Sequence, residues 1–220
     1  MKKLFIFTLL VVFGLVSIMA GVYLAPKFLN RNNSHPSIAN QETVGIVTNW
    51  VSSAMTIPEL VAEADLIVRA KVIEVADARS LSFVGPQFSE NGKADTQGID
   101  TVLFTDSILL VEETYKGSAD KQIIVMQTGG KVATESGSSL VEVYDDPLFV
   151  EGEEYVLFLV DISSDSTHAQ GRNLYRTINP AGRYIIQENH VFSYYEYSDS
   201  FIPPATLEEL LSEIENAVSD

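Results

Sequence analysis

Cysteine is absent from this chain of 220 residues. The absence excludes a disulfide scaffold, a zinc site built on thiolates, a cysteine nucleophile and attachment to a membrane through a lipidated cysteine. Hydrophobic residues make up 46% of the sequence, as in ordinary globular proteins. We therefore expect a folded body that is stable through the burial of apolar side chains alone.

Basic residues are scarce, since 14 lysines and arginines stand against 30 acidic residues and the formal net charge is −16. The first 25 residues hold Lys2, Lys3 and no acid, which leaves 12 basic and 30 acidic residues, or −18, for the rest. A field of this sign repels phosphate groups. We expect no nucleic-acid partner and no attraction of the folded part to anionic lipid headgroups.

Motifs for catalysis and metal binding are also missing. The three histidines, His35, His168 and His190, have no partner at a metal-ligand spacing, and we predict neither a metal nor a cofactor. Ser118 and Lys121 match the S-x-x-K pattern of β-lactamases, but they fall in a predicted turn and the accompanying motifs are absent. The sequence therefore predicts no catalytic residue.

Acidic side chains gather in two predicted loops. They are Asp145, Asp146, Glu151, Glu153 and Glu154 in the first loop, and Asp161 and Asp165 in the second. Loops rich in oxygen ligands can hold calcium, but the spacing here is not that of an EF-hand. We interpret these residues as a solvated rim and leave calcium binding as the alternative.

A long apolar run lies near the N-terminus. It extends from Leu4 to Ala25, and its 22 residues are enough to cross a bilayer as a helix. The alternative is a signal peptide cleaved after Ala20, but the run is longer than the usual apolar core of such peptides. We predict a transmembrane anchor over 1–25, with the remainder of the chain outside the cytoplasm. Secretion after cleavage remains the alternative.

The folded body is predicted over 56–200, after a linker or arm at 26–55, and a closing helix is predicted over 201–220. Its organising stretch is Thr101 to Gly130, where two apolar runs flank a polar turn at 116–120 and two glycines end the second run. Such a pattern indicates a β-hairpin. Because an isolated hairpin is marginal in water, other strands must cover it.

Several segments can supply those strands. Period-two alternation predicts a strand over 65–75, and a nearly all-apolar run predicts a central buried strand over 155–160. Capping boxes at Thr56 and Thr206 predict two helices, of which the second is amphipathic. Shorter strands are expected at 140–144, 174–178, 184–187 and 190–195.

A polar segment over 77–100 contains two turn-forming pairs, and we interpret it as a long loop. It also contains apolar residues that a solvated loop does not need. Aromatic residues gather at the end of the strand predicted over 190–195 and could offer rings to a sugar or peptide. The two segments provide the predicted interaction surface, which comprises Phe83, Val84, Phe88, Phe192 and Tyr194.

Four segments carry a resemblance to a known family: ADLIVRAKVIEV (64–75), ILLVEETYKG (108–117), IIVMQTGG (123–130) and FVEGEEYVLFLV (149–160). Their succession resembles the netrin-like domain of tissue inhibitors of metalloproteinases and cysteine-free bacterial exported proteins of the same layout. The resemblance implies a mainly β fold, a small barrel of the oligonucleotide/oligosaccharide-binding (OB) type with packed helices. Those inhibitors hold a protease zinc through an N-terminal cysteine, which this chain lacks, so the resemblance transfers the fold and no functional residue.

These observations favour a membrane-tethered, extracytoplasmic binding module without catalysis. Its expected partner is a protein or saccharide of the cell envelope, and residues 4–25 provide the contact with the membrane. The alternatives are an exported hydrolase that uses loop carboxylates and a protease inhibitor that acts through a loop.

Overall fold

A computed structural model of the chain divides into two compact units, residues 1–40 and residues 41–220. The structure describes residues 41–46, 50–88, 94–134, 137–143, 145–193, 195 and 203–219, all in the second unit. The predicted anchor therefore lies outside the described residues. Within the described part of the chain, no helix is long and apolar enough to span a bilayer.

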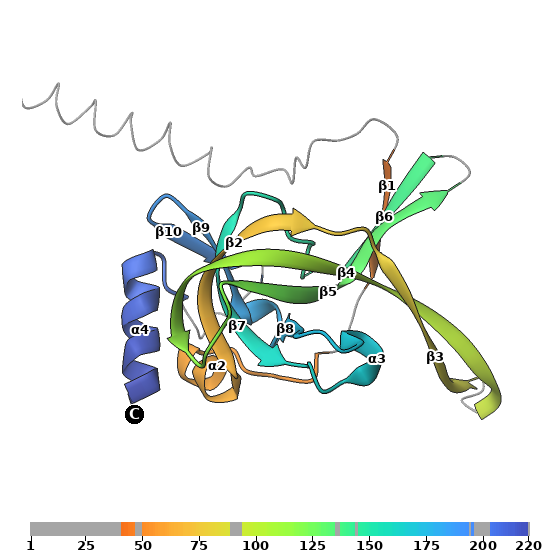
Figure 1. The fold of residues 1–220 in the computed structure, drawn as a ribbon, viewed down its shortest axis with the longest axis horizontal. Coiled ribbons are helices and arrows are strands. Elements are labelled where there is room, and N and C mark those ends of the chain that lie inside the picture. The colour runs from red at the N-terminus through yellow and green to blue at the C-terminus, as the bar shows by residue number, and fades with distance from the viewer. Residues whose placement is uncertain are drawn as a thin grey trace, which may run out of the picture. The chain divides into compact units, whose positions relative to one another are not determined.

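Five strands close a barrel: β2 (Leu66–Val75), β4 (Ala94–Lys116), β5 (Gln122–Thr134), β7 (Glu154–Asp161) and β8 (Tyr175–Thr177). β2, β4 and β5 form an antiparallel meander, and β7 pairs antiparallel with the free side of β2. β8 closes the barrel because it pairs antiparallel with β7 and parallel with β5. This strand order is consistent with an OB-like barrel (Figure 1).

The predicted central hairpin is confirmed. β4 and β5 pair antiparallel, and the chain turns between them at Gly117, where φ is +80°. A Cβ at this position would meet the backbone oxygen of Asp65, so both the conformation and the available space require glycine. Ser118 and Lys121 lie in the connection between the two strands, as predicted, and not at the start of a helix.

β7 is buried on both faces, as expected for the central strand predicted over 155–160. Tyr155, Leu157 and Leu159 join the cluster inside the barrel, whereas Val156 and Phe158 join a second cluster on its outer side. All five side chains are fully buried. The near-continuous apolar run reflects this coverage from two sides.

Helices cover one end of the barrel. α2 (Ile57–Glu63) and α4 (Leu207–Ser219) pack on the outer cluster, and the short strands β9 (Arg183–Gln187) and β10 (His190–Ser193) extend the sheet beside β7. A 3₁₀ turn, η1 (Pro180–Gly182), precedes β9. The two helices begin where the predicted capping boxes place them.

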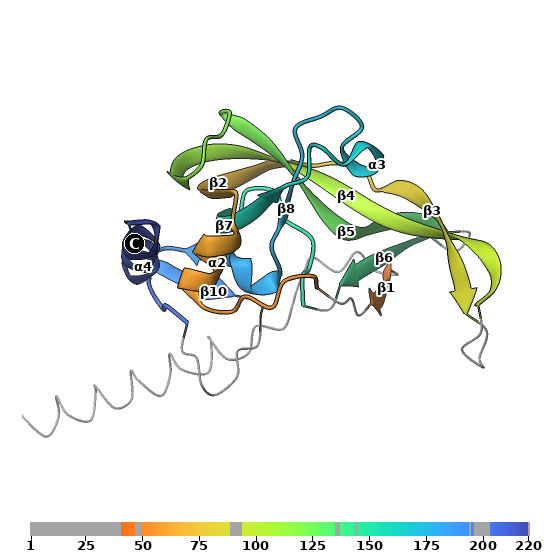
Figure 2. The same cartoon turned by 90° about the horizontal axis from the view of Figure 1, so that it is seen from below.

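The interpretation of residues 77–100 as a loop is wrong. β3 (Arg79–Phe88) pairs with the first half of β4 from Arg79–Phe104 to Phe88–Ala94. The two strands form a long hairpin that projects from the barrel at the end opposite α4 (Figures 1 and 2). The strand was not predicted because Gly85 and Pro86 are typical of turns. An edge strand such as β3 tolerates proline because one side of its backbone needs no partner.

The second strand of the central hairpin also continues beyond its predicted end. β5 passes through Gly129 and Gly130, which have positive φ angles of 113° and 152°, and reaches Thr134. Beyond Thr128 it leaves β4 and pairs with β6 (Gly137–Val143), which in turn pairs in parallel with β1 (Gln41–Ile46). These strands form a small wing on the same side of the barrel as the β3–β4 hairpin (Figure 1).

Candidate functional site

A cavity of about 290 Å³ lies at the end of the barrel from which the β3–β4 hairpin and the β5–β6 wing project. Strands β4, β5 and β8 and the segment between β7 and β8 supply most of its walls. Four side chains make the wall partly apolar: Trp50, Phe104, Met126 and Ile162. Its volume is near the lower end of the range of small-molecule sites, about 300–1,000 Å³.

Polar and ionisable groups line the rest of the cavity. The uncharged ones are Gln127, Thr128 and Thr177, and the ionisable ones are Asp146, Asp165, His168 and Arg176. The lining thus combines apolar and polar groups, and polar groups at fixed positions can orient a bound small molecule.

Gln127 fixes one wall through its side-chain amide. Its Nε2 donates to Asp146 Oδ1 at 3.2 Å and to the backbone oxygen of Pro147 at 3.0 Å, and its Oε1 accepts from the backbone N–H of Phe149 at 2.7 Å. A strand residue thereby fixes the connection that leads into β7. The amide and the carboxylate are both almost fully buried.

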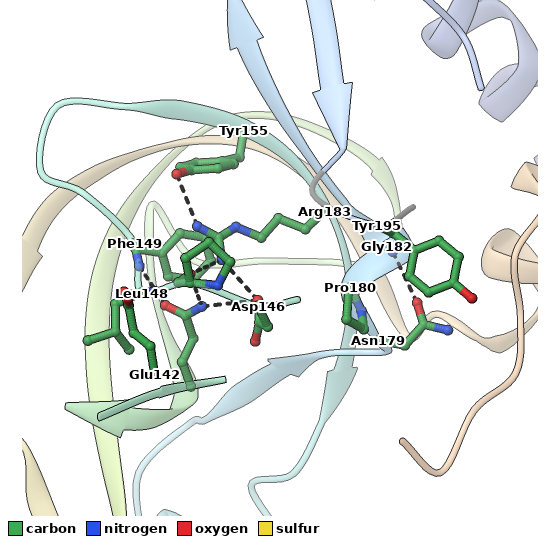
Figure 3. Close-up of polar contacts among 12 residues, drawn as sticks. Glu142, Asp146, Leu148, Phe149, Tyr155, Asn179, Pro180, Gly182, Arg183 and Tyr195 are labelled. Carbon is green, nitrogen blue, oxygen red and sulfur yellow. Dashed lines mark hydrogen bonds and ion pairs between the residues drawn. The ribbon is translucent and has the colours of Figure 1, made fainter. Parts of the chain in front are cut away.

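Asp146 is held from the other side by Arg183 (Figure 3). Arg183 Nη1 lies 2.9 Å from Asp146 Oδ1, and Nη2 donates to the Tyr155 hydroxyl at 3.1 Å. The guanidinium carbon also lies 4.3 Å from the centre of the Phe149 ring, a cation–π contact. Burial raises the pKa of Asp146, and the charge and hydrogen bonds of Arg183 and Gln127 oppose this rise.

A second cluster of charges lies near the cavity. Arg79 Nε and Arg172 Nη1 both donate to Asp106 Oδ2, at 2.9 and 2.8 Å. Arg79 Nη2 continues to Met126 Sδ at 3.3 Å and to the backbone oxygen of His168 at 3.0 Å, and both residues line the cavity. Two guanidinium groups share one carboxylate here, which leaves a local excess of positive charge.

The short helix α3 (Ser166–Ala169) completes the wall. Asp165 caps it by accepting hydrogen bonds from the backbone N–H groups of Thr167 and His168, and its Oδ2 lies 2.7 Å from His168 Nδ1. The hydrogen bonds from the side chain and then the backbone of His168 hold the pKa of Asp165 below its usual range. The His168 ring is set edge-on against Phe104, with ring centres 5.2 Å apart.

Arginine is concentrated around this cavity. Of the five arginines that the structure describes, Arg176 lines the cavity and three others belong to the two networks next to it: Arg79, Arg172 and Arg183. The fifth, Arg69 on β2, pairs with Glu154 on β7 and Glu112 on β4. An acidic protein thus places most of its described guanidinium groups at one end of its barrel.

Two groups at the cavity lack partners in the described part of the chain. Arg176 has no carboxylate within 4.0 Å among the residues that the structure describes, although the other four described arginines each have one. Trp50 Nε1 is buried and makes no hydrogen bond to a described residue. Arg176 is partly buried and lines the cavity, so it can meet a partner there, whereas Trp50 Nε1 is enclosed by protein atoms.

The predicted interaction surface does not coincide with this cavity. Phe192 lies on β10 with 41% of its surface exposed and stacks on His190 at a ring distance of 6.4 Å. Tyr194 and the side chains of Phe83, Val84 and Phe88 lie outside the described residues. None of the five residues of the predicted interaction surface is among the described residues that line the cavity.

Of the acidic residues that we interpreted as a solvated rim, Glu151, Asp161 and Asp165 are exposed, whereas Asp146 is buried. Asp146 is only 2% exposed, so for this residue the interpretation is wrong. Glu151 accepts from the backbone of Val75, Glu153 from the Tyr155 hydroxyl, and Glu154 from Arg69. Within the described residues, no group of three or more acidic or histidine side chains is arranged to hold a metal ion.

Sequence reasoning missed the cavity because its residues come from distant segments. Trp50, Phe104, Gln127 and Arg176 meet only when β5 and β8 close the barrel in parallel. One signal was available: an arginine-poor chain has Arg172, Arg176 and Arg183 within a short stretch. Comparison with known proteins adds no family, since no family model matches the chain and no curated protein matches it.

Proposed function

We propose that this chain is a membrane-tethered, extracytoplasmic binding module without catalytic activity, and that its ligand enters the cavity between β4, β5 and β8. The observation that carries the proposal is the cavity itself. It combines apolar side chains with Arg176, which has no carboxylate within 4.0 Å among the described residues. Such a combination favours the binding of a small molecule or of one residue of a larger partner.

The position of the cavity also supports a binding role. Its base is formed by paired strands and by the buried network of Gln127, Asp146 and Arg183, so the site is built on a rigid scaffold. The β3–β4 hairpin and the β5–β6 wing project from the same end of the barrel (Figure 1). A ligand carried by a larger partner would therefore meet further surface next to the cavity.

The hydrolase alternative receives less support from the loop carboxylates. Asp146 is buried in an ion pair, Asp165 caps α3, and Asp161 accepts from the backbone of Ser163. Glycosidase-type hydrolysis needs two carboxyl groups that face each other across a substrate. These three carboxylates instead contact neighbouring groups of the protein.

We also propose a relation to the netrin-like domains of metalloproteinase inhibitors. The OB-like strand order and the closing helix support it. The zinc-binding cysteine of those inhibitors is absent, so the relation would extend to the scaffold and not to the inhibitory mechanism. A protease-inhibitor function therefore has no specific observation in its favour.

The experiment uses the fluorescence of Trp50, which is the only tryptophan of the chain and lines the cavity. The full chain in non-ionic detergent is titrated with the small-molecule fraction of an envelope extract. We expect a change in emission for the parent and for Thr114→Phe, an equivalent substitution at an exposed position of β4. Thr128→Phe fills the cavity and should abolish the change. An equal response of both variants would show that the ligand binds elsewhere.

A further inference from the structure

We infer that the cavity binds a monocarboxylate with an apolar body, such as the C-terminal residue of a peptide, and that Arg176 pairs with the carboxylate. The inference rests on the proposed binding function and names the chemical class of its ligand. It depends on the charge state of the cavity, on the nature of its walls and on its size.

Arg176 is a cationic group that lines the cavity. It lies on β8 opposite Val160 and is partly buried. No described carboxylate lies within 4.0 Å of it, in a chain with 30 acidic residues. A partly buried guanidinium without a protein partner favours an anion, because charge-assisted hydrogen bonds are about twice as strong as neutral ones.

The neighbouring charges reinforce this preference. Arg79 and Arg172 share Asp106, Arg183 is matched by Asp146, and His168 contacts Asp165. Among the arginines around the cavity, Arg176 is the one without a described carboxylate within 4.0 Å. It offers a positive charge at the cavity of a chain whose formal net charge is −16. A local charge of this kind attracts an anion.

The walls of the cavity select among anions. Trp50, Phe104, Met126 and Ile162 offer apolar and aromatic surface, which a sulfate or phosphate ion would not cover. A planar guanidinium matches the two oxygens of a carboxylate, and the one guanidinium of Arg176 can pair with one carboxylate. The ligand that satisfies both features has one carboxylate and an apolar remainder.

The volume limits the size of that ligand. A cavity of 290 Å³ has room for about ten water molecules at roughly 30 Å³ each. This space fits one amino-acid residue or a small aromatic acid, so a larger ligand could place only one unit in it. A longer peptide could enter only with its terminal residue.

The test compares two probes that differ in charge. N-acetylphenylalanine carries the carboxylate, and N-acetylphenylalaninamide has the same body without the charge. Isothermal titration calorimetry on the full chain in non-ionic detergent should show that the acid binds about 10- to 100-fold more tightly than the amide, as expected for hydrogen bonds to a charged group. Inorganic phosphate serves as a second probe and should bind more weakly than the acid.

Matched variants locate the effect. Arg176→Gln should remove the preference for the acid and leave the affinity for the amide unchanged. Arg176→Lys keeps the charge and should retain part of the preference for the acid. It therefore shows whether a loss of preference in Arg176→Gln reflects the missing charge or misfolding. Lys121→Gln removes an equal charge at an exposed position in the β4–β5 turn and should behave as the parent.

The possible failures are distinguishable. If both probes bind equally, or if Arg176→Gln keeps the preference, the carboxylate assignment is wrong although the cavity remains a binding site. If phosphate binds more tightly than the acid, the site is an inorganic-anion site. If neither probe binds the parent, the carboxylate assignment also fails, and the response of Trp50 to envelope extract then decides separately on the proposed function.

Discussion

Arg183 and Asp146 form an ion pair in which both side chains are almost fully excluded from solvent. Removing two charges from water costs several kcal/mol per ion, and the pair is tolerated only when other groups satisfy its remaining donors and acceptors. Here Gln127 donates to Asp146, the Tyr155 hydroxyl accepts from Arg183, and the Phe149 ring lies against its guanidinium. The network fixes the connection before β7 and, with it, one wall of the cavity.

Breaking this pair should destabilise the protein strongly. We expect Arg183→Met to lower the free energy of unfolding by about 3–5 kcal/mol, because Asp146 is then left as a buried and uncompensated charge. Arg69→Met is the matched control: it breaks a surface pair in which the arginine is 32% exposed, and should cost about 0–1 kcal/mol. Denaturant unfolding measures both values. Equal losses in the two variants would contradict the structural role of the buried pair.

The pairing of Asp146 with Arg183 could not be predicted from the sequence. Asp146 stands among other acids in the chain, and that neighbourhood suggested a solvated rim. Its partner Arg183 is 37 residues away, and a pairing at that separation depends on the closed barrel. The burial of Leu157 could be predicted because an all-apolar run carries its own signal, whereas the burial of a charge depends on tertiary contacts that no local pattern encodes.

Among the secondary-structure elements, the capped helices and the apolar strands were predictable, and the β3–β4 hairpin was not. A capping box or a run of branched apolar residues acts within a few positions. The paired strands β3 and β4 contain Gly85, Pro86 and Gly98, which are poor strand formers, so their backbone pairing outweighs local preference. The continuation of β5 through Gly129 was missed for the same reason.

The outer part of this hairpin should be dispensable for folding. We expect replacement of residues 84–99 by Asn-Gly, which joins the paired residues Phe83 and Asp100 by a tight turn, to change the free energy of unfolding by less than about 1 kcal/mol. The reason is that Leu81, Val102 and Phe104, which pack at its base, remain. Chemical denaturation measures the change.

The same variant also tests the interaction surface predicted at Phe83, Val84 and Phe88. If that surface recognises an envelope protein, a tagged full-length chain should lose the captured protein while Trp50 still responds to small ligands. Unchanged capture would assign recognition to another surface, and loss of cooperative unfolding would show that the hairpin tip is part of the fold.

The cap of α4 should make stability depend on pH. Hydrogen bonds from the backbone N–H groups of Ala205 and Thr206 lower the pKa of Glu209 from its ordinary value of 4.5. A lowered folded-state pKa stabilises the protein above pH 4.5, and this stabilisation is lost as the pH falls through the folded-state value. Glu209→Gln should therefore melt below the parent at neutral pH, and the two melting curves should converge in acid. A constant difference at all pH values would contradict this coupling.

At the scale of the whole molecule, charge and location are linked. A chain with a formal net charge of −16 is repelled by anionic headgroups, so the proposed attachment to the membrane depends on the apolar run from Leu4 to Ala25. The folded unit of residues 41–220 then presents an acidic body whose cavity is lined by Arg176. This arrangement favours a small anion over a polyanion.

The membrane anchor can be tested by cell fractionation. We expect the full-length chain in the membrane fraction, resistant to high salt and released by detergent, with the C-terminal body accessible to protease added from outside the cytoplasm. The reason is that a continuous apolar run of 22 residues partitions into the bilayer core. Recovery of a soluble mature form that starts at Gly21 would support a cleaved signal peptide instead.

The most direct measurement of the central claim uses Trp50 as a probe of the charge of the cavity. We expect iodide to quench Trp50 more efficiently than caesium at the same ionic strength, because Arg176 and the neighbouring arginines attract anions even though the chain has a formal net charge of −16. Lys121→Gln should retain this order, and Arg176→Gln should reverse it. Stronger quenching by caesium in the parent would show that the cavity shares the negative field of the protein and would contradict an anion-binding site.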